Sequence, residues 1–435
     1  MELLRELLRL RTVNPPGDEG EVVALLEGYL SGAGLKTQIL TSPAGHSNLV
    51  ARVDGPSDRQ ALVLLSHSDV VPVEEGNWSR DPFGGELDDG FIWGRGSLDM
   101  KGIAVMHAVA AAKLALSGHR PVREVIVVMV ADEEAGGDEG TCWLLDEHPT
   151  QVGFGDGRPP PEVLGEGAYG VADVLERPVI PIAVGEKSAV WFDVIAEGES
   201  GHGALPPQQQ APVNLAAIVG AIAGFGTPRV HPVMREHFSA LAQAASGTTG
   251  AVFRALASPA SASVARVVAP RLRKAGALGL LLSDSVTPTA LAAGYKSNVV
   301  PGEARASFDC RLLPDTDTDE FLSSVDKRAR RHGGRVTNVV QKGHGPVSGK
   351  GPLFDILEGA SRELSPGAVP AVSLTPGITD VRFFRVRGAT GYGWAPLVLT
   401  PELLATTHGH DERVGVEEFE RAVAVMSDVV LRAST

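Results

Sequence analysis

The chain has 435 residues with 53 acidic and 39 basic side chains, and its formal charge is −14 at neutral pH. Because no run of Lys and Arg offers the positive surface that phosphate backbones require, we expect no nucleic-acid partner. Because a domain typically has roughly 150 residues, this chain length predicts two or three domains. The two cysteines, Cys142 and Cys310, are too few for a disulfide framework or a four-thiolate zinc site. Any metal must therefore be held by histidines and carboxylates.

The first ten residues, MELLRELLRL, carry a charge every three or four positions. This pattern is typical of an amphipathic helix and differs from the uninterrupted apolar stretch of a signal peptide. The apolar runs at 125–131 and 277–282 are far shorter than the roughly 20 residues that cross a bilayer. We therefore expect a cytoplasmic protein without a membrane partner.

The first part of the chain alternates helical and strand patterns. Residues 3–40 have a helical pattern around a break at 15–17, and β-branched runs at 47–53 and 61–65 predict strands. A helix at 101–117 and a continuous apolar strand at 122–130 then complete a strand–helix–strand unit. Such a unit is typical of a buried parallel sheet, whose ligands bind in the loops at the carboxyl ends of the strands.

A second unit follows the Gly/Pro-rich connector at 151–161. Its pattern predicts strands at 190–198, 289–294, 304–313 and 335–343 and helices at 212–225 and 319–331. This β-α-β-β-α-β order is typical of a split βαβ fold, here interrupted by an Ala/Arg-rich helical insertion at 228–282. Helices at 352–364 and 416–433 restore the first pattern. We therefore predict an α/β domain of residues 1–188 and 347–435, with an α+β domain of residues 189–346 inserted into it.

Several candidate metal ligands follow predicted strands or lie in glycine-rich loops. His67 and Asp69 lie two apart at the end of an apolar strand, so their side chains share one face. Asp99 follows the flexible GRGSL segment and precedes a helix. Each also has a purely structural interpretation, a strand-end histidine for His67 and a helix-capping aspartate for Asp69 and Asp99.

Three consecutive acids, Asp132, Glu133 and Glu134, follow the apolar strand at 122–130. Like charges at the end of a buried strand repel one another, so they require a cation or an exposed turn. Glu166 in GEGAYG and His408 in HGHDER add two more candidate ligands, although a surface turn or an exposed loop would explain either one alone.

Two divalent ions about 3.5 to 4 Å apart need one bridging carboxylate and two terminal ligands each. Five candidates match that number: His67, Asp99, Glu134, Glu166 and His408. Glu133 is then left unligated beside a ligand, where a carboxylate can act as general base toward a water molecule.

The segments HSD, GRGSLDMKG, ADEEAGG, GEGAYG and HGHDER, in this order, resemble the M20 family of dizinc metallopeptidases and aminoacylases. The resemblance implies a zinc-exopeptidase-like catalytic domain with a mixed central sheet flanked by helices, and a ferredoxin-like lid and dimerisation domain. It also implies that His67 and Glu166 bind one zinc ion, that Glu134 and His408 bind the other, and that Asp99 bridges them. Glu133 would be the general base and Asp69 would orient the His67 ring. His410 is the alternative to His408.

The resemblance assigns further residues to the substrate. His202 in GHGALP would reach the active site of a partner subunit and stabilise the oxyanion, and Asn298 and Arg311 would hold the substrate carboxylate or carbonyl. Gly377 and Thr379 would lie near the substrate, whereas Arg382 would serve there or in a structural ion pair. The 228–282 insertion departs from the family pattern and would replace or extend the surface of a homodimer.

The expected reaction is hydrolysis of an amide or peptide bond next to a free carboxylate. Two dications exceed the three negative charges of Asp99, Glu134 and Glu166 by one, so the pocket suits a small anionic N-acyl amino acid or peptide. The expected cofactors are two Zn²⁺ ions per subunit, and Co²⁺ or Mn²⁺ suit the same ligands. The alternatives are a non-catalytic binding protein with this fold and a single-metal hydrolase.

Overall fold

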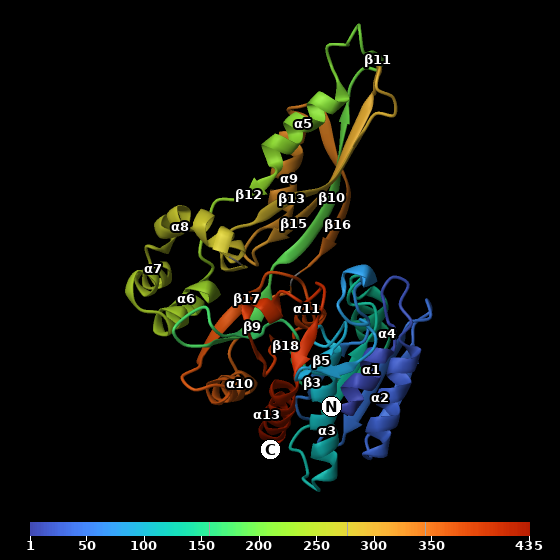
Figure 1. The fold of residues 1–435 in the computed structure, drawn as a ribbon, viewed down its shortest axis with the longest axis vertical. Helices are drawn as coiled ribbons and strands as arrows, with labels where there is room; N and C mark the ends of the chain where they lie inside the picture. The colour runs from blue at the N-terminus through green and yellow to red at the C-terminus, as the bar shows by residue number, and fades with distance from the viewer. Residues whose placement is uncertain (156, 276, 344) are drawn as a thin grey trace.

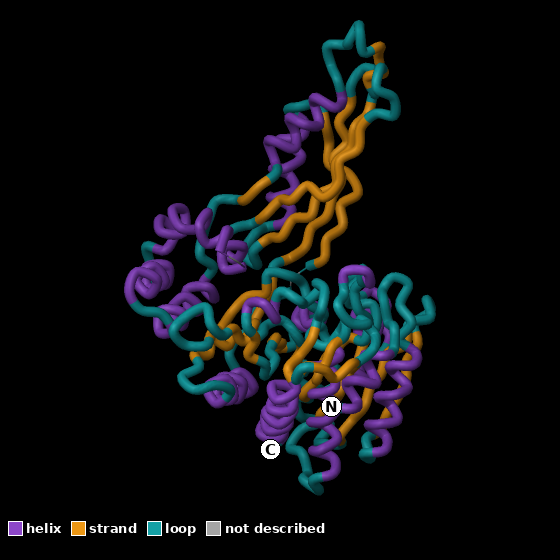
Figure 2. The backbone as a smooth tube through the Cα atoms, in the orientation of Figure 1, coloured by secondary structure: helices purple, strands orange, loops and turns teal. Residues whose placement is uncertain are grey.

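The computed structural model describes residues 1–155, 157–275, 277–343 and 345–435, so positions 156, 276 and 344 lie outside the described residues. Two sheets dominate the described residues, and the smaller one extends away from the larger one (Figures 1 and 2). Among all the described residues, no helix is long and apolar enough to span a membrane.

The larger sheet is mixed and is built from strands of both ends of the chain. β3 (Leu62–His67) lies at its centre and runs parallel to its neighbours β6 (Val125–Val130) and β7 (Glu162–Gly165). The remaining strands are β1 (Lys36–Thr41), β2 (Ser47–Val53), β8 (Gly170–Val171), β9 (Val179–Glu186), β17 (Val369–Thr375), β18 (Thr390–Gly393) and β19 (Val398–Leu399). The expected parallel strand–helix–strand unit is confirmed, because β3 and β6 are joined through α3 (Lys101–Leu116).

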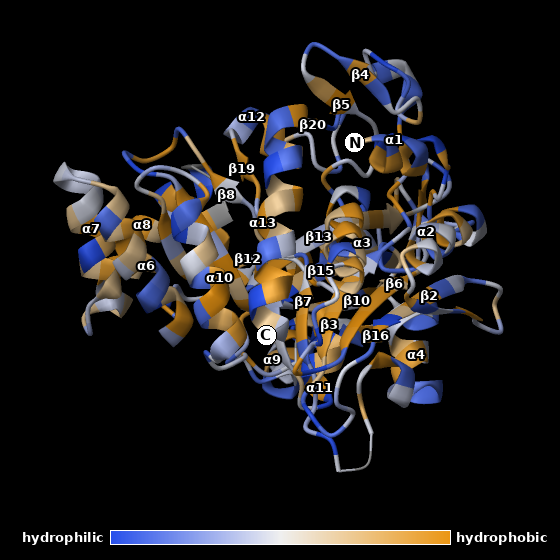
Figure 3. Ribbon diagram, turned by 90° about the horizontal axis from the view of Figure 1, so that it is seen from below, coloured by the Kyte–Doolittle hydropathy of each residue, from blue (hydrophilic) through white to orange (hydrophobic). Residues whose placement is uncertain are grey.

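Helices cover both faces of this sheet, which explains why its central strands β3, β6 and β7 are buried at every position and mostly apolar. Leu62 and Leu64 belong to one core cluster, whereas Val63 and Leu65 belong to another. Hydrophobic residues are concentrated on these central strands and on α3 (Figure 3). The first cluster lies under α1 (Glu2–Arg9), α2 (Gly20–Gly32), α3, α10 (Pro352–Glu363) and α13 (Val416–Ser434), and the second under α4 (Trp143–Glu147) and α11 (Val381–Val386).

The smaller sheet contains the predicted split βαβ unit. Its strand order is β12 (Gly224–Phe225), β13 (Ser285–Ala293), β15 (Glu303–Leu312), β10 (Ser188–Glu197) and β16 (Gly334–Lys342), all antiparallel. Alternate residues such as Phe192 and Phe308 pack under α5 (Ala211–Ile222) and α9 (Thr318–Arg330). The predicted fold class is therefore confirmed. The domain boundaries at 1–188 with 347–435 and at 189–346 remain our proposal.

Short elements complete the described residues. A three-stranded sheet joins β4 (Glu86–Asp88), β5 (Phe91–Trp93) and β20 (Arg413–Gly415). A two-stranded pair of β11 (Gly201–His202) and β14 (Val299–Val300) lies at the far tip of the smaller sheet (Figure 1). α12 (Pro401–Leu404) precedes the loop that carries His408.

The helical insertion packs in a different place from the smaller sheet. Its helices are α6 (Pro232–Ala244), α7 (Gly247–Ala257) and α8 (Ser261–Ala275), and α6 lies against β17 and β9 of the larger sheet (Figure 1). Phe238 shares a core cluster with Val369 and Ala371, and His237 Nδ1 lies 2.9 Å from the backbone oxygen of Val372. The insertion therefore covers outer strands of the larger sheet and does not extend the smaller one.

The helical pattern expected through residue 40 is wrong for its last part. Lys36–Thr41 forms β1, which pairs antiparallel with β2 from Lys36 opposite Arg52 to Thr41 opposite Ser47. The segment contains three β-branched residues, Thr37, Ile39 and Thr41, which favour a pleated strand once a partner strand is available.

Phe238 provides a test of how tightly the insertion is integrated, because its side chain is 0% exposed. We expect Phe238→Ala to lower the free energy of unfolding by about 3–5 kcal/mol, since the buried ring is lost and a cavity remains. Urea unfolding followed by circular dichroism measures this change. Val267→Ala on the exposed face of α8 is the control, with an expected change within about 0.5 kcal/mol. A loss below about 1 kcal/mol for Phe238→Ala would show that the helices do not depend on the sheet.

Candidate dinuclear metal site

The candidate ligands converge at the carboxyl edge of the central parallel strands. His67 is the last residue of β3, Glu166 directly follows β7, and Glu134 lies in the loop after β6. Because these three strands are parallel neighbours, their carboxyl ends meet at one edge of the sheet. Asp99 precedes α3, and His408 comes from the loop between α12 and β20.

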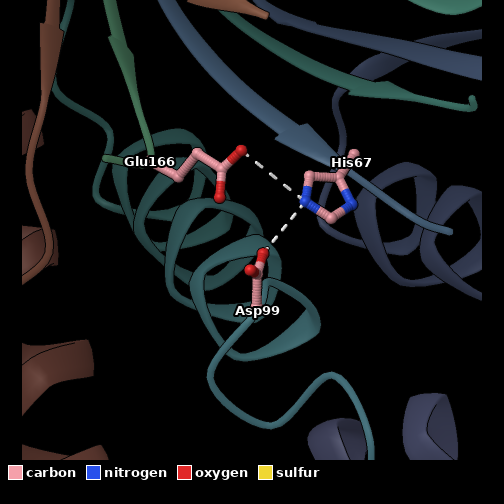
Figure 4. Close-up of side chains that lie close together, drawn as sticks. All are labelled: His67, Asp99 and Glu166. Atoms are coloured by element: carbon pink, nitrogen blue, oxygen red, sulfur yellow. Dashed lines mark hydrogen bonds and ion pairs between the residues drawn. The ribbon is translucent and has the colours of Figure 1, made fainter. Parts of the chain in front are cut away.

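Asp99 lies between the two histidines and faces each with a different oxygen. His67 Nε2 is 3.2 Å from Asp99 Oδ1 and 3.7 Å from Glu166 Oε1 (Figure 4). His408 Nε2 is 3.0 Å from Asp99 Oδ2 and 3.2 Å from Glu134 Oε1. The five side chains therefore form two groups of three that share the carboxylate of Asp99.

The donor set of each group fits a divalent cation. In both groups the candidate ligand atoms lie within 4.8 Å of one another, and each group offers one imidazole and two carboxylates. His67 Nδ1 is 3.0 Å from the backbone oxygen of Asp69, so Nδ1 carries the proton and Nε2 keeps its lone pair for a metal. These donors suit zinc and other borderline divalent ions.

The crowding of carboxylates shifts the pKa values of the site. Burial would lower the pKa of His67, but the charge of Glu166 helps to raise it well above its usual value. Burial and the charge of Asp99 raise the pKa of Glu166 to about 8. Hydrogen bonds to Asp99 and Glu134 raise the pKa of His408 to about 10. A raised pKa favours the protonated form of each of these three groups, so the site favours added positive charge. A bound cation would also supply that charge.

Asp69 organises the loop that carries the acids as well as the His67 ring. Its carboxylate accepts the backbone N–H groups of Glu133 and Glu134 at 3.2 and 3.0 Å, and its Oδ1 lies 3.5 Å from His67 Nδ1. It also accepts the side-chain amide of Asn14 at 2.9 Å. Asn14 was not predicted, because it lies 55 positions away in sequence and no local pattern marks it.

Glu133 lies beside the two groups and belongs to neither. A small pocket between β3, β6 and β7 is lined by His67, Glu133, Glu166 and Asp380. Burial and the charge of Glu166 raise the pKa of Glu133 well above its usual value. Its placement therefore agrees with a carboxylate that remains free when the neighbouring groups hold metal.

The segment 377–382 contributes less side-chain surface to the pocket than expected. Gly377 is partly exposed, with open space around it, but Thr379 is buried and its hydroxyl donates to Glu186 at 2.8 Å. The side chain of Thr379 is thus engaged with β9. Arg382 is also buried and donates to the backbone oxygens of Thr379 and Gly136 at 2.8 Å each. Its Nη1 also lies 3.7 Å from Asp380 Oδ1, so of the two expected roles the structure shows the structural ion pair.

The lid residues fall into two places. Arg311 lies near the end of β15 and pairs with Ala189, close to the point where the chain passes from the larger sheet into β10. Nε and Nη2 of Arg311 donate to the carboxylate of Asp309 at 2.7 and 2.9 Å. His202 and Asn298 are exposed at the far tip of the smaller sheet, where the N–H of Gly203 donates to the backbone oxygen of Asn298 at 2.9 Å (Figure 1). The structure therefore does not bring His202 or Asn298 to the metal-ligand groups of its own chain.

The two histidines of HGHDER are separated by the fold. His408 belongs to a metal-ligand group, whereas His410 is exposed and belongs to neither group. His408 adopts a positive φ of 58°, a conformation that is uncommon outside glycine and occurs where the surrounding structure imposes it. The side chain of His408 is itself 49% exposed, but the backbone of this loop directs its Nε2 toward Asp99 and Glu134.

The chain belongs to peptidase family M20/M25/M40, since the model of that family matches residues 63–432. Aminoacylase-1 of Sus scrofa is 29% identical over 438 residues, covering 98% of this chain and 93% of that protein. The M20 family metallo-carboxypeptidase Sso-CP2 from Sulfolobus solfataricus has the same fold, with a TM-score of 0.74, 17% identity, and coverage of 99% and 98% of the two chains. A dinuclear metal binding peptidase of the M20 family from Bacillus subtilis also aligns, with a TM-score of 0.60, 13% identity, and coverage of 100% and 97%.

Proposed function

We propose that this chain is a metal-dependent hydrolase that cleaves an amide bond next to a free carboxylate in N-acyl amino acids or small peptides. The observation that carries the proposal is the pair of ligand groups sharing Asp99, with the unligated Glu133 beside them. His67 and Glu166 would complete one metal site, and Glu134 and His408 the other. Two Zn²⁺ ions are the proposed cofactors, and Co²⁺ or Mn²⁺ accept the same donors.

The residues of the chain have separate tasks in this reaction. Bound divalent ions would lower the pKa of a water molecule and polarise the substrate carbonyl. Glu133 takes the proton of the attacking water and delivers it to the nitrogen of the leaving amine, as a free carboxylate next to the reacting atoms can do. Asp69 keeps Glu133 in place through the backbone N–H groups of the same loop.

The substrate class rests on the family and on Arg311. Similarity to aminoacylase-1 supports N-acyl amino acids, and membership of a peptidase family supports small peptides. Arg311 binds the carboxylate of Asp309 through two nitrogens, and the same planar fork suits the free carboxylate of a substrate. Open space surrounds Gly377, since a Cβ added there would meet no atom within 4 Å, and we propose that this residue lines the substrate path.

We further propose a homodimer through the inserted unit. His202 and Asn298 are exposed far from the metal-ligand groups of their own chain, where they could contact the active site of a partner. The exposed face of α5 is small and apolar, and the outer edge of β13 is exposed from Ala290 to Ala293. Such a helix face next to an open strand edge suits contact with a second copy of the same surface. The exposed α5 residues are Val213, Ala216, Ala217, Gly220 and Ala221.

We place the enzyme in the cytoplasm. Cys142 and Cys310 are both free thiols. Free thiols without any disulfide suit a reducing compartment.

A metal-dependent substrate screen tests the proposed function. We expect the chelated protein to be inactive and one of Zn²⁺, Co²⁺ or Mn²⁺ to restore hydrolysis of an N-acetyl, N-succinyl or long-chain N-acyl amino acid or a dipeptide. The α-carboxamide of the best substrate is the matched control, and it should lose about tenfold or more in kcat/KM because a charge-assisted hydrogen bond to Arg311 is lost. Failure of every substrate after reconstitution would favour a non-catalytic binding protein. Full activity with one bound ion would favour a single-metal hydrolase.

A further inference from the structure

Glu412 is a buried carboxylate outside the metal-ligand groups, although it lies only four residues after His408. Its side chain is 0% exposed. Oε1 accepts three backbone N–H groups, those of Gly96, Leu98 and Asp99, at 3.1, 2.8 and 3.1 Å. One oxygen of Glu412 therefore holds the backbone of the loop that ends at Asp99.

Arg95 completes the arrangement from the other side. Its guanidinium is 2% exposed, donates through Nη1 to Glu412 Oε2, and donates through Nη2 to the backbone oxygen of Gly409 at 2.8 Å. The N–H of Gly94 also donates to the backbone oxygen of Glu412 at 2.9 Å. These contacts join the loop at 94–99 to the loop at 408–412.

The two joined loops carry two residues of one candidate metal group. Asp99 lies on the first loop and His408 on the second, and His408 Nε2 is 3.0 Å from Asp99 Oδ2. Charge-assisted hydrogen bonds are strong where water is excluded. The buried carboxylate of Glu412 receives four donors, and water cannot replace them if it moves away. The spacing of Asp99 and His408 therefore depends on the contacts between Arg95 and Glu412.

We propose that Arg95 and Glu412 are positioning residues that hold Asp99 and His408 at the spacing which a divalent ion requires. Partners that orient the ligands of a metal commonly affect its affinity when they are changed. Arg95 is suited to this task because its planar fork reaches both Glu412 and Gly409, whereas the ammonium of a lysine has no such fork. The inference rests on the proposed function, because it requires that the Asp99, Glu134 and His408 group binds metal.

Calorimetric titration of the metal-free protein with Co²⁺ provides the test, with the visible absorption of Co²⁺ as a second readout of ligand geometry. Wild-type protein should bind two ions, and His408→Ala identifies which step belongs to the group of Asp99, Glu134 and His408. We expect Glu412→Gln to weaken that step by about 10- to 100-fold, since the new amide places a donor against Arg95 or against the three N–H groups. Arg95→Lys, which keeps the charge but loses the fork, should weaken it by about tenfold.

Matched controls separate positioning from general stability. Glu162 forms a buried pair with Arg123 at the amino end of β7, so Glu162→Gln removes a comparable charge away from the ligands. It should lower the melting temperature of the metal-free protein without changing either metal-binding step. Unchanged Co²⁺ affinity and absorption in both Arg95→Lys and Glu412→Gln, beside two normal steps in the wild type, would overturn the inference. Failure of the wild-type protein itself to bind a divalent ion would instead overturn the proposed function.

Discussion

Replacing Glu133 by glutamine is expected to lower kcat by about 10³-fold while two metal ions remain bound. The reason is that Glu133 lies in neither ligand group, yet lies beside both, so its loss removes the proton acceptor without removing a ligand. Steady-state kinetics and metal analysis of the same preparation measure the two effects.

Glu134→Gln is the matched control for this experiment, because Glu134 is the neighbouring acid and belongs to a ligand group. It should lose metal together with activity. Loss of metal in Glu133→Gln would make Glu133 a ligand. Near-normal kcat in that variant would remove Glu133 from the proton transfer.

The second large effect is expected for His202→Ala, with kcat lowered by about 10²-fold or more and KM changed little, because a donor to the developing oxyanion is lost. His202 is exposed at the tip of the inserted unit, so in the proposed dimer it acts on the site of the partner. His119→Ala, at another exposed histidine, is the control and should leave kcat unchanged.

Mixed dimers make this prediction sharper. When His202→Ala and Glu133→Gln chains are mixed and allowed to exchange, half of the dimers contain one active site with both residues intact. The mixture should then recover about a quarter of the wild-type activity, although each parent is nearly inactive. No recovery despite demonstrated exchange would exclude action across the dimer, and an unchanged kcat in His202→Ala would exclude His202 from the reaction.

The sequence was most informative where local patterns coincide with chemistry. His67, the acids at 132–134 and Glu166 each come at or just after an apolar run, and in a parallel sheet such positions meet at one edge regardless of the details of packing. The split βαβ order could also be predicted, because strand and helix periodicities are local properties of the chain. The place of β1 could not, since Lys36–Thr41 is a strand because of its partner β2.

Residues that act through distant contacts were missed for a physical reason. Asn14 has no distinctive local pattern, and Glu412 lies in the HGHDER segment without any local sign of its partners. Their roles arise from hydrogen bonds to groups 55 and more than 300 positions away in the chain. Thr379 was expected near the substrate, but its hydroxyl donates to Glu186 of β9. Only the folded backbone decides which partner a short polar side chain reaches.

By itself, the sequence determined the chemical character of this protein: few thiols, a set of imidazoles and carboxylates in a family-specific order, and a two-part architecture. Those features depend on residue type and local periodicity. The tertiary structure decided that His408 and not His410 joins a ligand group, that α6 covers β17, and that His202 lies far from its own ligand groups. These outcomes depend on long-range packing and backbone direction, which a linear pattern does not contain.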